Sequence, residues 1–222
     1  MRVPLVTGGR LDLDRDDMSA TFSVPEPLSD ADLLHPYLAP AAAWFSHWLG
    51  RHSFHAGCVV FGGRAYAVAG DKEAGKSSLL AWLSIHGHTV VADDLVVLDG
   101  ERILTGPRAI DLRAPTVEAL ALASAVDVRG GTRHRIALSQ TEAEWPFGGW
   151  IFLSWGPRIE IRSIPPRDRL ATLLASRVAQ VVPHNPADLV ALAARPAWTL
   201  ARPRGWDVMD RLSELVSSTV AG

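Results

Sequence analysis

The chain has 222 residues, of which 48% are hydrophobic and 21% are charged, and its formal net charge is −2 at pH 7. These values suit one globular domain with a substantial core and exclude disorder over most of the length. The small net charge excludes a broad electrostatic surface for nucleic acid or an anionic membrane, so neither is expected as a partner. No run approaches the ~18 apolar residues of a membrane span, and the cytoplasm is therefore the expected location.

Residues 1–50 are expected to form strands and a packing helix that belong to the same unit as the rest of the chain. Four prolines interrupt residues 25–40, which indicates a strand or two followed by a meandering connection. Residues 41–49 then read AAAWFSHWL, with three aromatic side chains on one helical face. This spacing predicts a short packing helix in preference to an aromatic binding stripe.

Two short apolar runs, His55–Phe61 and Ala65–Ala69, are separated by Gly62-Gly63-Arg64. This arrangement predicts a β-hairpin. The only cysteine, Cys58, lies in the first run, so the chain has neither an internal disulfide nor a cysteine cluster for a metal. We expect its thiol to be buried and unreactive.

The predicted hairpin leads into the segment GDKEAGKS, from Gly70 to Ser77, and a pattern of helical period follows. A strand, a G-x-x-x-x-G-K-S loop and a helix in this order are the context of a phosphate-binding loop. The glycines let successive N–H groups converge on an anion, and the helix adds its positive end. Lys76 would reach the β- and γ-phosphates, and the Ser77 hydroxyl would ligate Mg²⁺.

This loop predicts a nucleoside triphosphate site. The alternative is a glycine-rich turn without a ligand, because so short a pattern also arises by chance. Asp71 and Glu73 are expected to face solvent, and Lys72 is either solvated or a second phosphate contact. The predicted nucleotide-binding residues are Gly70, Asp71, Lys72, Glu73, Ala74, Gly75, Lys76, Ser77 and Ser78.

Two adjacent carboxylates, Asp93 and Asp94, follow a strand expected over His88–Ala92. One helix and one strand separate them from Lys76, so the chain returns to the same edge of the sheet. Charges within an apolar stretch cost burial energy unless they have ligands, which favours a functional pair over a solvated turn. A kinase needs one carboxylate for hydrated Mg²⁺ and a group that orients the incoming hydroxyl, and the two residues can divide these roles.

The remaining segments predict an α/β domain with a mixed sheet. Extended segments are expected at residues 95–98, 102–105 and 133–138, the last bracketed by Gly130-Gly131 and residues 145–149. A hairpin around Gly156-Pro157 is expected to join residues 150–154 to 158–164. Helices are expected at residues 77–86, 114–123, 167–178, 186–194 and 205–216.

Other polar residues carry weaker signals. His86 and His88 flank Gly87 at the end of a predicted helix, where they would cap its C-terminus. Arg108 lies in a predicted turn. An arginine can stabilise a transferring phosphoryl group, but a solvated face is the simpler interpretation. The same applies to the one dense basic tract, which comprises Arg129, Arg133, His134 and Arg135.

Together the motifs resemble the catalytic domain of HPr kinase/phosphorylase, the bacterial serine kinase of a phosphocarrier protein. The signature of that family is a His-Gly strand, a phosphate loop, then Gly-His and Ala-Asp-Asp. Its counterparts here keep an unbroken spacing and are His55-Ala56-Gly57, Gly70–Ser77, Gly87-His88 and Ala92-Asp93-Asp94. The resemblance implies an α/β nucleotide-binding domain over residues 51–222, with the P-loop at the edge of a mixed β-sheet.

The resemblance also implies roles for individual residues. His55, Lys76 and Asp94 fall on catalytic positions, with Asp94 as the acceptor of the proton from the substrate hydroxyl. Ser77 falls on the Mg²⁺ position, and Asp93 is assigned to the metal with it. The cofactors are then ATP and Mg²⁺.

The chain departs from the family pattern in several places. The N-terminal domain of the full-length enzymes is absent or reduced to residues 1–50. No Glu-Ile-Arg-Gly segment, which is tied to phosphorylase activity, is found, although Glu118 lies near the expected distance. The late Pro-Gly-Arg-Asn element is missing, so no arginine is assigned by resemblance. We therefore expect a minimal kinase without phosphorylase activity.

The predicted function is transfer of the γ-phosphoryl group of ATP to a serine hydroxyl of a peptide or protein. Short relatives of this kind are similar to the kinases of lasso-peptide and other ribosomal peptide pathways, which implies a precursor peptide as substrate. Two alternatives stay open: a small-molecule hydroxyl kinase, and a nucleotide-dependent binding module without phosphotransfer. The family forms hexamers, so a homo-oligomer is a further open expectation.

Overall fold

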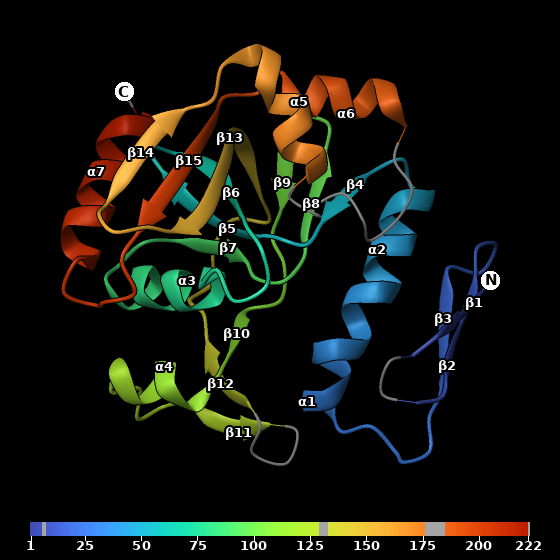
Figure 1. The fold of residues 1–222 in the computed structure, drawn as a ribbon. Helices are drawn as coiled ribbons and strands as arrows, with labels where there is room; N and C mark the ends of the chain where they lie inside the picture. Colours follow the sequence, from blue (N-terminus) through green and yellow to red (C-terminus); the bar gives the residue numbers. More distant parts are fainter. Residues whose placement is uncertain (6–7, 129–132, 176–184, 222) are drawn as a thin grey trace.

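The computed structural model describes residues 1–5, 8–128, 133–175 and 185–221. These residues form a mixed α/β fold around one large sheet, with helices on both of its faces (Figure 1). Two smaller sheets of three strands each lie beside it. None of the described helices combines the length and the apolar content needed to cross a bilayer. The prediction of an α/β domain with a mixed sheet is confirmed.

The central sheet has nine strands, and its main path has the order β4-β8-β9-β13-β6-β5-β7. β15 pairs with β13, and β14 pairs with β15. Most neighbours are antiparallel, but β13 is parallel to both β6 and β15. The strands are β4 (His52–Phe54), β5 (Gly57–Phe61), β6 (Arg64–Ala69), β7 (Val90–Ala92), β8 (Val96–Asp99), β9 (Arg102–Leu104), β13 (Glu144–Trp155), β14 (Glu160–Ser163) and β15 (Ala197–Arg202).

The strand directions place four carboxyl ends at one edge of this sheet. β6, β13 and β15 run in the same direction. β7 runs that way too, because β7 and β6 are both antiparallel to β5. The predicted β5–β6 hairpin is confirmed, and it delivers the chain into residues 70–75 at this edge. Helix α3 (Lys76–Ile85) begins directly afterwards, so the strand, loop and helix expected around Gly70–Ser77 are present.

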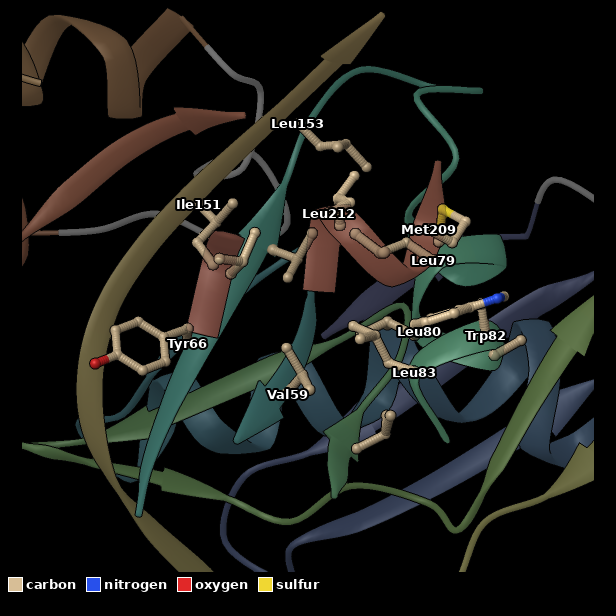
Figure 2. Packing of buried hydrophobic residues seen from close by; sticks show 14 of the residues in the cluster. Val59, Tyr66, Leu79, Leu80, Trp82, Leu83, Ile151, Leu153, Met209 and Leu212 are labelled. Atoms are coloured by element: carbon tan, nitrogen blue, oxygen red, sulfur yellow. The ribbon is translucent and has the colours of Figure 1, made fainter. Parts of the chain in front are cut away.

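Two hydrophobic cores lie on the two faces of the central sheet. On one face, Leu79 and Leu80 of α3 and Leu212 of α7 (Met209–Ala221) pack against β5, β6 and β13, as Figure 2 shows. On the other face, α5 (Pro166–Ala175) and α6 (Pro186–Ala193) pack over Trp150 and its neighbours. Cys58 is fully buried in this second core, where burial raises the pKa of its thiol, so the prediction of a buried cysteine is confirmed.

The N-terminal part contains an antiparallel sheet and a helix. The sheet comprises β1 (Arg2–Pro4), β2 (Arg10–Asp14) and β3 (Ser19–Ser23). The chain then forms α1 (Asp30–Asp32), the π-helical turn η1 (Leu33–Tyr37) and α2 (Leu38–Trp48). The aromatic side chains of α2 pack against the cluster around Leu11 and Leu13, which confirms a packing helix, although it begins earlier than expected.

A second small sheet follows the central strands β8 and β9. It has the order β10-β12-β11, with β10 (Ala109–Leu112), β11 (Val126–Val128) and β12 (Arg133–Ala137). Helix α4 (Ala114–Ala119) is shorter than the expected helix at residues 114–123. β10 was not predicted, and it lies next to α3. This sheet therefore places its residues close to the helix that begins at Lys76.

The predicted hairpin around Gly156-Pro157 is wrong. β15 lies between β13 and β14, pairing parallel with β13 and antiparallel with β14. Residues 197–202 carry no strand signal in the sequence, because a short strand with neighbours on both sides lacks the strict alternation of a half-buried strand. The strand that ends at Arg202 was therefore missed.

Other differences concern boundaries. Residues 145–149, expected as a break, belong to β13, which tolerates Pro146 because its pairing changes there from β9 to β6 with an irregular register. The last helix is Met209–Ala221 and not 205–216. Gly130-Gly131 and residues 176–178, at the end of the expected helix 167–178, lie outside the described residues.

Leu80→Ala should lower the free energy of unfolding by about 2–5 kcal/mol, because it removes buried contacts and leaves a cavity. Leu80 is 0% exposed between α3 and the sheet. Urea unfolding followed by circular dichroism measures the change. The matched control is Leu174→Ala on α5, where the side chain is 50% exposed and a loss below ~1 kcal/mol is expected. Equal losses at the two positions would contradict this placement of the core.

Candidate functional site

A cavity of about 1220 Å³ lies where residues 70–78 meet the carboxyl ends of β7, β13 and β15. Residues of η1 and α2 line it as well, and so do residues of β10 and β12. Of the predicted site residues, only Ala74 is not part of the lining; it is buried. The predicted residues that the cavity brings together are His55, Gly70, Asp71, Lys72, Glu73, Gly75, Lys76, Ser77, Ser78, Asp93 and Asp94.

The turn from β6 into α3 depends on two glycines. Gly70 has φ +156°, and a Cβ atom there would lie 2.7 Å from the backbone oxygen of Leu153. Gly75 has φ +86°, and its Cβ position lies 2.6 Å from Arg202 Nη2 and 3.0 Å from the ring of Trp155. A side chain at either position would displace its neighbours, so the local geometry requires both glycines of the G-x-x-x-x-G-K-S pattern.

Lys76 opens α3, and its ammonium group folds back into the loop. Nζ donates to the backbone oxygens of Gly70 at 2.9 Å and Asp71 at 3.2 Å, and the residue is 9% exposed. Burial lowers the pKa of Lys76, and the carboxylates of Asp93 and Asp94 act against that shift. An ammonium held at the start of a helix offers a positive site that suits phosphate oxygens.

Asp93 lies beside the first turn of α3. Ser77 Oγ donates a hydrogen bond to Asp93 Oδ1 at 3.2 Å. Burial raises the pKa of Asp93 to about 6, outweighing the opposite effect of the Ser77 hydrogen bond. A carboxylate that loses hydration in this way is stabilised by a cation.

The Ser77 hydroxyl and the Asp93 carboxylate form a donor set of two hard oxygens, which fits Mg²⁺. Among the described residues, no group of three His, Cys, Asp or Glu side chains could hold a metal ion by itself. Mg²⁺ commonly uses one or two protein oxygens together with phosphate and water oxygens. Phosphate and water oxygens could therefore complete the coordination of a metal held by these two side chains.

Asp94 and His55 form a pair next to this donor set. His55 Nδ1 lies 3.1 Å from Oδ1 of Asp94 and 3.0 Å from its backbone oxygen. The hydrogen bond with Asp94 raises the pKa of His55. Asp94 has φ +69°, a strained conformation for a non-glycine residue that is found at functional sites. The side chains are 50% and 36% exposed, so a ligand in the cavity can reach both.

Two contacts tie the loop and α3 to the segment after β10. Residues 71–73 are exposed, as expected for Asp71 and Glu73. The Glu73 carboxylate nevertheless pairs with Arg113 at 3.0 Å. Ser78 Oγ lies 2.9 Å from Thr116 Oγ1 on α4. These contacts hold the small sheet against the edge of the cavity.

Two groups in the cavity were not predicted from the sequence. Asp111 and Arg135 form a bidentate ion pair, with nitrogen–oxygen distances of 2.7 and 2.8 Å and side chains about one-tenth exposed. Arg202 and Arg204 both lie over the ring of Trp155 beside the loop. Arg135 belongs to the basic tract, but that tract suggested a solvated face, and no local motif marks Asp111, Trp155, Arg202 or Arg204. Trp155 and Arg202 each end a strand, β13 and β15. These positions indicate the site only once both strands are known to run parallel to β6, because their ends then lie at the same edge of the sheet as the loop.

The two histidines at the end of α3 are where they were expected, but Arg108 is not. The backbone N–H of His88 caps the end of α3 by donating to the Leu83 oxygen at 2.9 Å, whereas its side chain points to α7, with Nε2 2.9 Å from the Ser213 hydroxyl. His86 keeps its expected place at the helix end, with Nδ1 2.7 Å from the backbone oxygen of Trp82. Arg108 is not a free surface side chain, since its guanidinium donates to backbone oxygens of β7 and Ser139, and it does not line the cavity.

The basic tract is not a solvated face. Arg135 pairs with Asp111, and Arg133 lines the cavity. His134 pairs with Asp127. Arg129 lies outside the described residues. Glu118 is exposed on α4 and does not line the cavity.

Asp93→Asn should stabilise the protein measured without nucleotide and divalent cations, and the gain should depend on pH. Folding raises the pKa of Asp93 from 3.8 to about 6, so ionisation above about pH 6 costs folding free energy. Because part of the residue faces the cavity, we expect a gain of about 1–2 kcal/mol near pH 8. The gain should shrink as the pH falls from about 6 toward about 4.

Urea unfolding at several pH values measures this gain. Asp210→Asn, at an exposed position on α7, is the control and should show no such dependence. A loss of stability near pH 8 in Asp93→Asn would mean that protein contacts alone satisfy the carboxylate, against its interpretation as part of a metal site.

The sequence matches no protein-family profile, and no curated protein matches it. One solved structure that aligns with the chain is the Hpr(Ser) kinase/phosphatase from Coxiella burnetii. The alignment has a TM-score of 0.41 and 13% sequence identity, and it covers 76% of this chain and 90% of that chain. Similarity of this extent assigns neither a family nor an activity, so the function of this chain has to follow from the residues of its cavity.

Proposed function

We propose that this protein is a kinase that uses ATP and Mg²⁺ and transfers the γ-phosphoryl group to a serine hydroxyl of a peptide or protein. One observation carries the proposal: a single cavity contains the loop with Lys76, the Ser77–Asp93 oxygen pair and the Asp94–His55 pair. A nucleotide-dependent switch needs the first two groups but has no use for the third. A carboxylate paired with a histidine suits activation of an acceptor hydroxyl.

Each group has a role in the proposed reaction. The backbone of residues 70–77 and Lys76 hold the phosphates of ATP. Ser77 and Asp93 hold Mg²⁺, which when bound neutralises charge on the β- and γ-phosphates. Asp94, oriented by His55, accepts the proton of the acceptor hydroxyl. The serine oxygen forms its bond to the γ-phosphorus as the bond to the β–γ bridging oxygen breaks, so ADP leaves.

The size and lining of the cavity support a peptide or protein acceptor. Its volume, about 1220 Å³, is above the roughly 300–1,000 Å³ of common ligand sites. Leu34, Leu38 and Ala42 add an apolar wall from η1 and α2. The resemblance to lasso-type peptide kinases favours a ribosomally made precursor peptide. Since α2 forms part of the wall, we treat residues 1–50 and 51–222 as one functional unit.

The test is incubation of the purified protein with γ-labelled ATP and Mg²⁺. Separate reactions contain peptides encoded next to its gene, HPr protein, or a metabolite pool. Label on a serine of a peptide or protein is the expected result. Label only on a metabolite would identify a small-molecule kinase, and ATP binding without any labelled acceptor would identify a binding module. Either of these two results would overturn the proposal.

Asp94→Asn should reduce phosphoryl transfer by about 10²- to 10⁴-fold, because the amide cannot accept the hydroxyl proton. ATP affinity should change by no more than a few-fold, since the loop and the Ser77–Asp93 pair are intact. Transfer assays and calorimetric titration measure the two quantities. Asp210→Asn on α7 is the matched control and should leave both unchanged. Loss of ATP binding together with transfer would count against the role of Asp94.

Ser77→Ala should remove most of the gain in ATP affinity that Mg²⁺ gives the wild type, a loss on the order of tenfold. The hydroxyl is one of the two protein oxygens at the proposed metal position. Titrations of ATP with Mg²⁺ and with a chelator give the comparison. Ser84→Ala, further along α3, should behave as the wild type. If Ser77→Ala keeps the full effect of Mg²⁺, the metal is held elsewhere.

A further inference from the structure

Arg202 is a buried arginine without a carboxylate partner in the described part of the chain. It is 2% exposed at the end of β15, and its Nε has no hydrogen-bond partner among the described residues. Nη2 makes a long contact of 3.4 Å with the backbone oxygen of Gly75, and Nη1 lies 3.8 Å from Met209 Sδ. The guanidinium stacks on the ring of Trp155 at 4.3 Å from its centroid.

This arrangement is unfavourable for the protein by itself. Burial lowers the pKa of Arg202 to about 10, and no carboxylate opposes the shift. A cation–π contact offsets only part of the cost of a buried charge. Arg204 lies over the same ring at 4.8 Å, so two positive groups share one indole. An anion close to this pair would balance the charge.

Trp155 and Arg202 both lie against the phosphate loop. Trp155 Nε1 donates to the backbone oxygen of Glu73 at 3.0 Å, and Arg202 contacts the backbone oxygen of Gly75. These contacts fix the loop on both sides of Ala74, where it enters α3. A Cβ atom at Gly75 would lie 2.6 Å from Arg202 Nη2, so the guanidinium is as close to the loop as a glycine permits.

We propose that Arg202, held in place by Trp155, is a further positive element of the phosphate loop that sets its affinity for nucleoside di- and triphosphates. Arg202 acts as a positioning residue, because it holds the loop backbone at Gly75 and adds a positive charge beside the phosphate chain. The inference rests on the proposed function, because it takes the anion to be the phosphate chain of the nucleotide. The exposed Arg204 extends the same positive surface toward solvent.

The experiment compares the wild type with Arg202→Met. ATP, ADP and AMP are titrated in the presence of Mg²⁺, and thermal unfolding is followed without ligand. Arg202→Met should weaken ATP binding by about 10- to 100-fold, with smaller losses for ADP and AMP because fewer negative charges are involved. Its unfolding temperature without ligand should rise by about 2 °C or more, because an unpaired buried charge is removed.

Two further variants serve as controls. Arg167→Met removes a charge from a side chain that is 85% exposed on α5 and should change neither quantity. Arg202→Lys keeps the charge without the planar stack and should recover part of the affinity for ATP.

A purely structural role for Arg202 predicts a lower unfolding temperature and equal affinity losses for the three nucleotides, and this result would overturn the inference. Failure of Arg202→Met to fold would overturn it too, because the charge would then be required for folding. Unchanged ATP affinity in Arg202→Met would refute the inference and leave the proposed function in place. Failure of the wild type to bind any of the three nucleotides would refute the proposed function itself.

Discussion

The site depends on the contact between the Lys76 ammonium group and the backbone of its own loop. The ammonium group donates to the backbone oxygens of Gly70 and Asp71, and this geometry requires the turn between the two glycines of the loop and a helix that begins at Lys76. The charge is almost enclosed by protein, and the carboxylates of Asp93, Asp94 and Asp71 act on it. Enclosed charges are stabilised by ligands of opposite sign. The lysine therefore favours an anion, and Asp93, whose pKa burial raises, favours a cation.

Strand direction explains why these charges meet. β6, β7, β13 and β15 all point toward the same edge of a sheet that is otherwise largely antiparallel. The loop follows β6, the acidic pair follows β7, and Trp155 and Arg202 end the other two strands. Ligands bind at the carboxyl ends of strands in many open α/β sheets. Here that edge collects the positive loop, the two carboxylates and the stacked arginines in one cavity.

The local parts of this site could be predicted from the sequence, and the long-range parts could not. The spacing of Gly70, Gly75 and Lys76, with a strand before and a helix after, is enough to predict the loop, although its glycines also pack against the distant residues Leu153, Trp155 and Arg202. Asp93 and Asp94 follow within one helix and one strand, so their return to the same edge is also a local inference. Trp155 and Arg202 are far away in the sequence, and only the position of β15 between β13 and β14 places them beside the loop. The sequence predicted solvated side chains for Arg108 and Arg135. Their partners, the carbonyl oxygens of β7 and the Asp111 carboxylate, come next to them only when the chain folds.

The most direct measurement is a crystal structure of the protein with Mg²⁺ and a non-hydrolysable ATP analogue. We expect the phosphates to lie within residues 70–77, with Lys76 Nζ turned from the Gly70 and Asp71 oxygens to the β- and γ-phosphates. The metal should be bound by Ser77 Oγ and the Asp93 carboxylate, and Asp94 should face the γ-phosphate. A nucleotide bound outside the loop, or a metal held without Ser77 and Asp93, would contradict the proposed kinase site.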